Sequence, residues 1–121
     1  MQRFDATAFD GPGIDRHVSP DESDGNVLVV TKHLDPGDGS DYHAHPDSVD
    51  LAVVLSGTMH VLTGAERAED AESIPVSAGS VAYVPPGEPH ALVNDGDEPC
   101  TFVFVQAPPD RGYTPGSRDE R

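Results

Sequence analysis

Short apolar runs, each closed off by Gly, Pro, Asn or Asp, follow one another along most of the chain. Runs of this length, rich in Val and Leu, predict β-strands, and Val27-Leu28-Val29-Val30 is typical of a strand covered on both faces. The charged, Ala-rich segment 64–73 can be interpreted as a short helix, but its place between closely spaced strands favours an exposed loop with one helical turn. No long helix is indicated, so the pattern predicts an all-β sandwich or barrel. We expect strands at 14–18, 26–34, 49–55, 58–63, 74–76, 80–84, 90–93 and 100–106, and a further strand bearing His43 and His45.

The length of 121 residues predicts one domain with a single core. We expect an N-terminal arm with an edge strand over 1–25, the barrel over 26–107, and a charged tail rich in Pro and Gly over 108–121. The tail is either disordered or lies on a neighbouring chain. Trp is absent, so Val, Leu and Ala must fill most of the core.

Acidic residues outnumber basic ones by 22 to 7, which gives a formal net charge of −15. Such a negative field repels nucleic acid and anionic membranes, so neither is expected as a partner. The simplest interpretation is a well-solvated acidic surface. A sharper one is a halophilic source, in which high salt screens the self-repulsion of the acidic groups.

Other features bear on the compartment of the protein. No stretch has the length of a membrane span, and residues 1–9 lack the basic start and apolar run of a signal peptide. A cytoplasmic protein is therefore expected. Cys100 is the only cysteine, which excludes an intrachain disulfide and a Cys-rich metal site.

Four side chains form a candidate metal site. His43 and His45 are two residues apart, which on an extended strand places both imidazoles on the same face. Asp50 opens the next apolar run, and the rigid turn 85–89 leads directly into His90. Three imidazoles and a carboxylate are a ligand set that Fe, Mn, Ni, Zn or Cu accepts, so one divalent transition metal is the predicted cofactor.

The spacing of these residues resembles the two signature motifs of the cupin superfamily. The first motif is matched by Gly37, His43-Ala44-His45, Asp50 and Gly57, and the second by Gly79, Pro85-Pro86-Gly87, His90 and Asn94. The segment 58–78 separates the two motifs. The resemblance implies a jelly-roll barrel, or double-stranded β-helix, with a metal ion held by His43, His45, Asp50 and His90. The glycines and Pro85 are interpreted as turn-formers.

Asp50 stands where cupins usually carry Glu. Its side chain is one methylene shorter, so its oxygens start about 1.5 Å nearer to the backbone. Either the strand shifts inward, or a water bridges the gap, or the three histidines hold most of the metal. Alternatively, Asp50 orients one of the imidazoles without touching the ion.

Further residues are candidates for contact with a substrate. His60 has the opposite strand parity from Met59 and Val61, and it either faces the cavity as an acid/base group or faces water. The candidate pocket walls, most of which would serve equally as ordinary core, are Met59, Val61, Tyr83, Leu92, Phe102 and Phe104.

The resemblance implies a small metal-dependent enzyme acting on a small organic acid or another oxygenated metabolite. A dioxygenase-like activity is the first hypothesis, with isomerase and lyase as competitors. The alternatives are a non-catalytic cupin module that binds a metabolite or a metal, and a degenerate cupin in which Asp50 has abolished tight metal binding. A homodimer, formed through sheet edges or exchanged terminal strands, is also expected.

Overall fold

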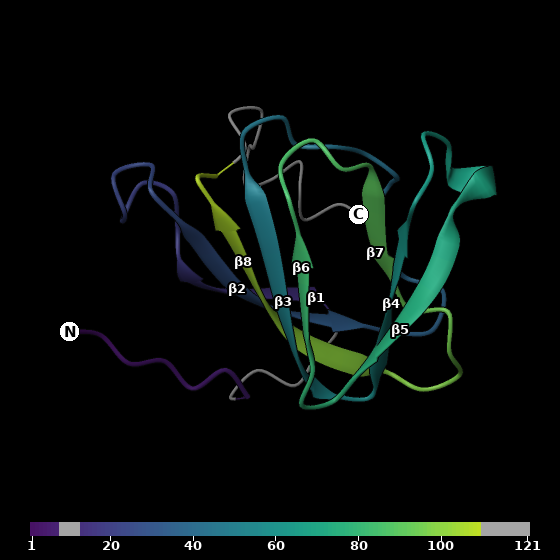
Figure 1. Cartoon of the computed structure of the whole chain (residues 1–121). Coiled ribbons are helices and arrows are strands. Elements are labelled where there is room, and N and C mark those ends of the chain that lie inside the picture. Colours follow the sequence, from purple (N-terminus) through teal and green to yellow (C-terminus); the bar gives the residue numbers. More distant parts are fainter. Residues whose placement is uncertain (8–12, 110–121) are drawn as a thin grey trace.

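The computed structural model describes residues 1–7 and 13–109, and in this part of the chain nearly all regular structure is β-strand (Figure 1). The elements in chain order are β1 (Gly13–Val18), β2 (Leu28–Leu34), β3 (Val49–Ser56), β4 (Thr58–Thr63), η1 (Ala68–Asp70), β5 (Glu72–Ser77), β6 (Val81–Val84), β7 (His90–Val93) and β8 (Cys100–Ala107). Among these residues, no helix is long and apolar enough to cross a membrane.

The strands form two antiparallel sheets. The larger sheet has the strand order β1-β2-β8-β3-β6, and the smaller one has the order β5-β4-β7. Figure 1 shows the two sheets inclined toward each other, with the turn at Gly57 carrying the chain from β3 in one sheet to β4 in the other. The prediction of an all-β jelly roll is confirmed.

Side chains alternate between the two faces of each strand, so every second residue points into the space between the sheets. On β8 the even-numbered residues from Cys100 to Gln106 are buried, and on β3 the buried set is Asp50, Ala52 and Val54. The two sets face the same interior because β3 and β8 are hydrogen-bonded neighbours. The buried apolar cluster comprises Leu28, Val30, Ala52, Val54, Met59, Val61, Leu92, Cys100, Phe102 and Phe104.

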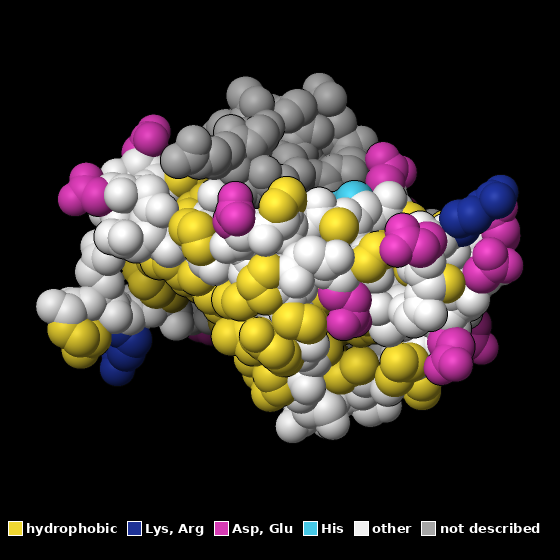
Figure 2. Space-filling model, turned by 45° about the horizontal axis from the view of Figure 1, so that its top comes forward, with side chains coloured by type: hydrophobic (Ala, Val, Ile, Leu, Met, Phe, Trp, Pro, Cys, Tyr) yellow, Lys and Arg dark blue, Asp and Glu magenta, His cyan; other side chains and the backbone are white. Residues whose placement is uncertain are grey.

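The outward face of β3 and β6 also carries apolar side chains. The exposed residues on this face are Leu55 on β3 and Val81 and Tyr83 on β6, and the two strands are hydrogen-bonded neighbours. Figure 2 shows hydrophobic side chains gathered on one face of the molecule, with acidic side chains around them. The expected homodimer stays a prediction.

Most predicted strand boundaries agree with the observed ones. β4 and β7 begin and end where expected, and the edge strand expected over 14–18 is β1. The segment 64–73 is a loop with the single short turn η1, as favoured from the sequence. Of the tail predicted over 108–121, residues 110–121 lie outside the described residues.

Candidate metal centre

Two reciprocal backbone hydrogen bonds hold the first histidine of the site against the last one. His43 and His90 form an isolated antiparallel bridge, although 46 residues lie between them in the sequence. The amide of His43 donates to the carbonyl of His90 at 2.9 Å, and the amide of His90 donates back to the carbonyl of His43 at 2.8 Å. Because both bonds join the two residues directly, the separation of their side chains is fixed by the backbone.

The expected strand through His43 and His45 is not present as such. His43 makes only that single bridge, and the chain bends at Pro46, which has no amide hydrogen to continue a ladder. His45 is secured instead by the amide of Gly87, which donates to its carbonyl at 2.8 Å. The shared face predicted for the two imidazoles is nevertheless observed, since both rings turn toward His90.

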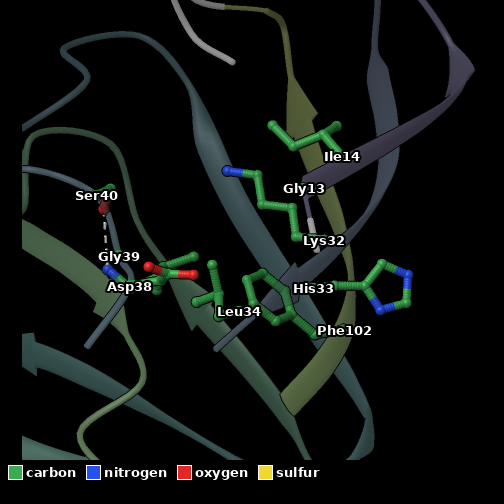
Figure 3. Close-up of a pocket in the computed structure, with 10 residues that line it drawn as sticks. Gly13, Ile14, Lys32, His33, Leu34, Asp38, Gly39, Ser40 and Phe102 are labelled. Carbon is green, nitrogen blue, oxygen red and sulfur yellow. Dashed lines mark hydrogen bonds between the residues drawn. The ribbon is translucent and has the colours of Figure 1, made fainter. Parts of the chain in front are cut away.

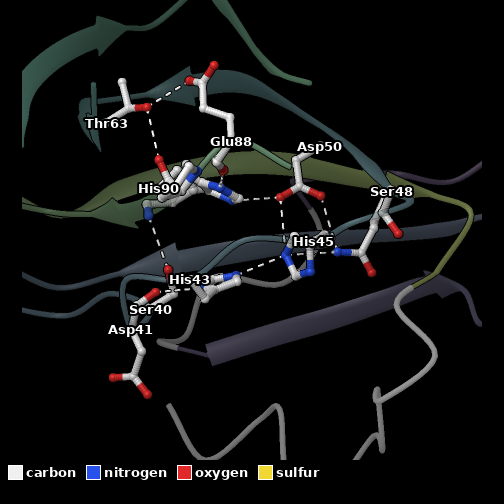
Figure 4. A network of polar contacts seen from close by, with 12 residues as sticks. Ser40, Asp41, His43, His45, Ser48, Asp50, Thr63, Glu88 and His90 are labelled. Carbon is white, nitrogen blue, oxygen red and sulfur yellow. Dashed lines mark hydrogen bonds and ion pairs between the residues drawn. The ribbon is translucent and has the colours of Figure 1, made fainter. Parts of the chain in front are cut away.

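The three imidazole rings converge on one point (Figure 4). One ring nitrogen from each of His43, His45 and His90 lies within 4.8 Å of the others. The Nε2 atoms of His43 and His45 are 2.9 Å apart. His45 and His90 are buried, whereas His43 is only partly covered, so the cluster is reached from the side of His43.

The hydrogen bonds on the far side of two rings suit them for metal binding. Nδ1 of His90 donates to the carbonyl of Glu88 at 2.8 Å, and Nδ1 of His43 donates to the carbonyl of Asp41. A neutral imidazole protonated at Nδ1 carries its lone pair on Nε2, and these are the atoms that point at the centre. Outer hydrogen bonds of this kind orient histidine ligands in metalloproteins. The three rings therefore fit a divalent transition metal.

Asp50 lies beside the three rings on the inner face of β3. Its Oδ2 is 2.8 Å from Nε2 of His90 and 3.5 Å from Nε2 of His45. Burial disfavours the charged carboxylate, but the hydrogen bond from His90, the electrostatic attraction of His45 and the amide of Gln106 outweigh it and lower the pKa of Asp50. Asp50 is therefore a carboxylate at neutral pH, and its charge complements a cation at the centre.

His90 shows the reverse shift. Burial disfavours its charged form, but hydrogen bonds to Asp50 and to the Glu88 carbonyl outweigh burial and raise the pKa of His90 above its ordinary value of 6.5. Without an ion, the proton on Nε2 therefore joins His90 and Asp50 as a buried pair. Metal binding at Nε2 must displace that proton.

Gln106 is a site residue that the sequence reasoning missed. Its side chain is fully buried on β8, directly across from Asp50 in the strand register. Its Nε2 donates to Oδ1 of Asp50 at 3.1 Å and lies 3.4 Å from Nε2 of His45. The signal in the sequence was a polar residue at an inward position of a strand whose other inward residues are Cys100, Phe102 and Phe104.

A small hollow opens beside the cluster. It measures about 230 Å³, counted with the open solvent at its mouth, and is lined by Lys32, Ser40, His43, His45, Asp50, His90, Leu92 and Phe104. Leu92 and Phe104 are thus the predicted pocket residues that adjoin the metal candidates. Phe102 lines a neighbouring hollow, and Met59 and Val61 are buried in the apolar core.

Two predicted contact residues face away from this hollow. His60 lies on the outer side of β4, where its Nδ1 accepts a hydrogen bond from the amide of Asp95 at 3.2 Å. An acid/base role in the cavity is therefore wrong, because the alternating parity that buries Met59 turns His60 outward. Tyr83 is 59% exposed on β6 and lines neither the hollow beside the histidines nor the neighbouring one, since it pairs with the outward-facing Leu51.

The last residue of the second motif has a structural role. Asn94 is fully buried, and its Nδ2 donates to the carbonyls of Leu34 and Glu98 at 3.0 and 2.8 Å. Its Oδ1 accepts from the amide of Gly96 at 3.0 Å. Asn94 thus anchors the β7–β8 turn to the end of β2, and it is not a ligand candidate.

Comparison with known proteins agrees with the fold and the site. Residues 30–106 match the cupin domain family, and the chain belongs to that family. The chain is 34% identical over 112 residues to a glucose-6-phosphate isomerase of Pyrococcus abyssi, an alignment that covers 86% of this chain and 58% of the relative. The chain thus spans a little over half the length of the curated relatives that it matches.

Solved structures show the same architecture. A Klebsiella pneumoniae protein with a double-stranded β-helix domain is 32% identical, with a TM-score of 0.61 and a coverage of 74% of each chain. A predicted oxalate decarboxylase from Thermotoga maritima has a TM-score of 0.66 at 21% identity, and it covers 78% of this chain and 77% of its own. The second likeness concerns the fold alone.

Proposed function

We propose that this protein is a metal-dependent enzyme that acts on a small organic acid or a related oxygenated metabolite. The observation that carries the proposal is the convergence of His43, His45 and His90, whose ring nitrogens lie within 4.8 Å of one another beside an open hollow. Three imidazoles leave positions on a transition-metal ion to which substrate oxygens can bind. A buried apolar wall on one side of the hollow, formed by Leu92 and Phe104, excludes water from part of it.

The residues around the ion position have separate roles in this proposal. When bound, the metal acts as a Lewis acid that polarises an oxygen of the substrate. The three histidines would hold it, with His43 and His90 oriented by their outer hydrogen bonds to backbone carbonyls. Asp50 supplies negative charge, and its Oδ2 is the atom best placed to take up or hold a proton beside the rings.

Dioxygenase-like chemistry is the first activity to test, and isomerase or lyase chemistry is the second. The second candidate, isomerisation, is supported by the 34% identity to the glucose-6-phosphate isomerase of Pyrococcus abyssi, of which the alignment covers 58%. Isomerases and lyases commonly remove a proton next to a carbonyl, for which a buried carboxylate such as Asp50 serves as a base.

The test uses protein stripped of metal and reloaded separately with Fe(II), Mn(II), Ni(II) and Zn(II). A panel of small hydroxy and keto acids and sugar phosphates is followed by oxygen uptake, and by proton NMR in D₂O for exchange of carbon-bound hydrogen. We expect one of the two readouts to depend on the added metal, to be lost in His43→Ala, and to survive in the control His60→Ala. A complete lack of metal-dependent uptake and exchange would favour a non-catalytic binding module.

A further inference from the structure

Lys32, the only lysine of the chain, faces the interior of the barrel. In the register of the large sheet Lys32 lies opposite Phe102, and Val30 lies opposite Phe104. Val30, Phe102 and Phe104 are all buried, so this face of β2 and β8 is the inner one. Lys32 is half-buried on this inner face, where its charge is only partly solvated.

The side chain of Lys32 extends along the inner face of the sheet toward the metal candidates. Its Nζ lies 4.5 Å from the ring centroid of Phe104, a cation–π distance. Phe104 is two residues closer along β8 to Gln106, which pairs with Asp50. The ammonium group therefore reaches back along the inner face toward the three histidines.

Lys32 lies where two hollows meet. It lines the small hollow that contains His43, His45, Asp50 and His90, and it also lines a larger one of about 530 Å³, measured in the same way. Ser40 and Leu92 are the other residues common to both. Figure 3 shows Asp38, Gly39 and Ser40 on one side of the larger hollow, and Ile14 and Lys32 on the other.

The positive charge of Lys32, where the two hollows meet, contrasts with the negative net charge of the molecule. Among the described residues that line the two hollows, Lys32 is the one Lys or Arg, in a chain with a net charge of −15. The ammonium group of Lys32 beside a metal candidate attracts an anion, and it does so more strongly in a partly desolvated place than in water.

We propose that Lys32 is the anion-binding residue of this site, and that the substrate carries a carboxylate or phosphate group. This inference rests on the proposed function, whose substrate class it narrows. The anionic group binds Nζ of Lys32 while a hydroxyl or carbonyl oxygen of the same molecule faces the three histidines. The remainder of a longer substrate occupies the larger hollow, where the hydroxyl of Ser40 and the carboxylate of Asp38 are placed to bind its hydroxyl groups.

Calorimetric titration tests the proposal with probes that differ in charge. Glycolate and inorganic phosphate are the anionic probes, and glycolamide is the neutral analogue of glycolate. Each is titrated into the wild type, Lys32→Met, Lys32→Arg and Arg67→Met, with and without Mn(II). Arg67 is an exposed cation that pairs with Glu69, so its removal controls for the loss of one positive charge from the protein.

We expect one anionic probe to bind about tenfold more weakly to Lys32→Met, with glycolamide unaffected, Arg67→Met unchanged and Lys32→Arg close to the wild type. The preference between glycolate and phosphate identifies the anion. Equal weakening of glycolate and glycolamide would show a merely structural role, and unchanged binding of both anions to Lys32→Met would overturn the proposal.

The titrations without metal test the role of Lys32 independently of whether the proposed function is correct. Without Mn(II) we expect weaker binding that still depends on Lys32 and on the charge of the probe. If the protein takes up no metal, the proposed function fails, and the metal-free comparison of the wild type with Lys32→Met still decides the role of Lys32. A circular dichroism melt of each variant checks the fold, and Lys32→Gln replaces Lys32→Met if the latter unfolds.

Discussion

Oδ2 of Asp50 lies 2.8 Å from Nε2 of His90, forty residues further along the chain. The same oxygen is 3.5 Å from Nε2 of His45, while Oδ1 accepts a hydrogen bond from Gln106 at 3.1 Å. The shorter side chain that takes the place of the usual Glu thus still brings its carboxylate against the ring nitrogens. Asp50 is therefore a direct neighbour of any ion held there, either as a ligand or as the group that orients the rings.

Substitution of Asp50 is expected to change metal affinity. Asp50→Asn keeps the shape but removes the charge, and we predict that it weakens binding by about 10- to 100-fold. Asp50→Glu restores the charge and the longer arm, so it should bind at least as tightly as the wild type. Competition with a chromophoric chelator measures both affinities. If Asp50→Asn binds the metal as tightly as the wild type, the carboxylate has no role at the ion.

Gln106 is predicted to hold Asp50 in place. Gln106→Leu removes the donor to Oδ1 and leaves a buried carboxylate oxygen unsatisfied, which we expect to cost about 1–3 kcal/mol in the free energy of unfolding. Urea unfolding of the metal-free protein measures this cost. In an Asp50→Ala background the same substitution should cost much less, because no carboxylate remains to be satisfied. Equal costs in the two backgrounds would mean that the amide acts through packing alone.

The buried pair of Asp50 and His90 predicts how stability depends on pH in the metal-free protein. The raised pKa of His90 gives a stabilisation that is complete below its ordinary value of 6.5 and is lost as pH rises through the folded-state pKa. The lowered pKa of Asp50 gives a second stabilisation. It is present above pH 3.8, the ordinary pKa of the group, and is lost as pH falls through the folded-state pKa of Asp50. The pair therefore stabilises most between pH 3.8 and 6.5.

Urea unfolding in the presence of a chelator checks this window. The difference in unfolding free energy between the wild type and His90→Gln should be larger at pH 5 than at pH 8.5. A difference that does not change between these two pH values would contradict the assignment of the shared proton.

Gly57 allows the close approach of β4 to the start of β8. It has a φ of +73°, and a Cβ there would meet the carbonyl of Pro99 and lie 3.0 Å from Cα of Cys100. Gly64 has a φ of +93° with nothing within 4 Å, so it is the matched control. We predict that Gly64→Ala costs about 1–2 kcal/mol for the left-handed backbone, and that Gly57→Ala costs about 1–3 kcal/mol more. Thermal unfolding of both variants measures the difference, and equal costs would show that the turn relaxes away from Pro99.

The sequence predicted much of the fold because its alternating apolar runs and Gly/Pro turns are local signals. β4 and β7 were predicted to the residue. The grouping of His43, His45, Asp50 and His90 came from the resemblance in motif spacing, and the structure brings these four side chains together. What holds them is less visible in the sequence, because the reciprocal hydrogen bonds between His43 and His90 depend on which segments pair.

The remaining errors have a common physical origin in strand register. Gln106 was overlooked because a single polar residue gains its meaning only when β8 is placed against β3, opposite Asp50. Tyr83 was assigned to a pocket because an aromatic side chain suits either face, and its pairing with Leu51 turns it to the outside. The inward position of Lys32 likewise follows from its register with Phe102 and not from its neighbours in the sequence.

The central claim is that His43, His45 and His90 bind one metal ion together. Its most direct test is elemental analysis of the purified protein, followed by titration of the metal-free chain with Mn(II) and Zn(II). We predict one ion per chain for the wild type and for His60→Ala, and a loss of at least about tenfold in affinity for His43→Ala and for His90→Ala. A wild-type chain that takes up no ion, or a His90→Ala variant that binds as tightly as the wild type, would contradict the account.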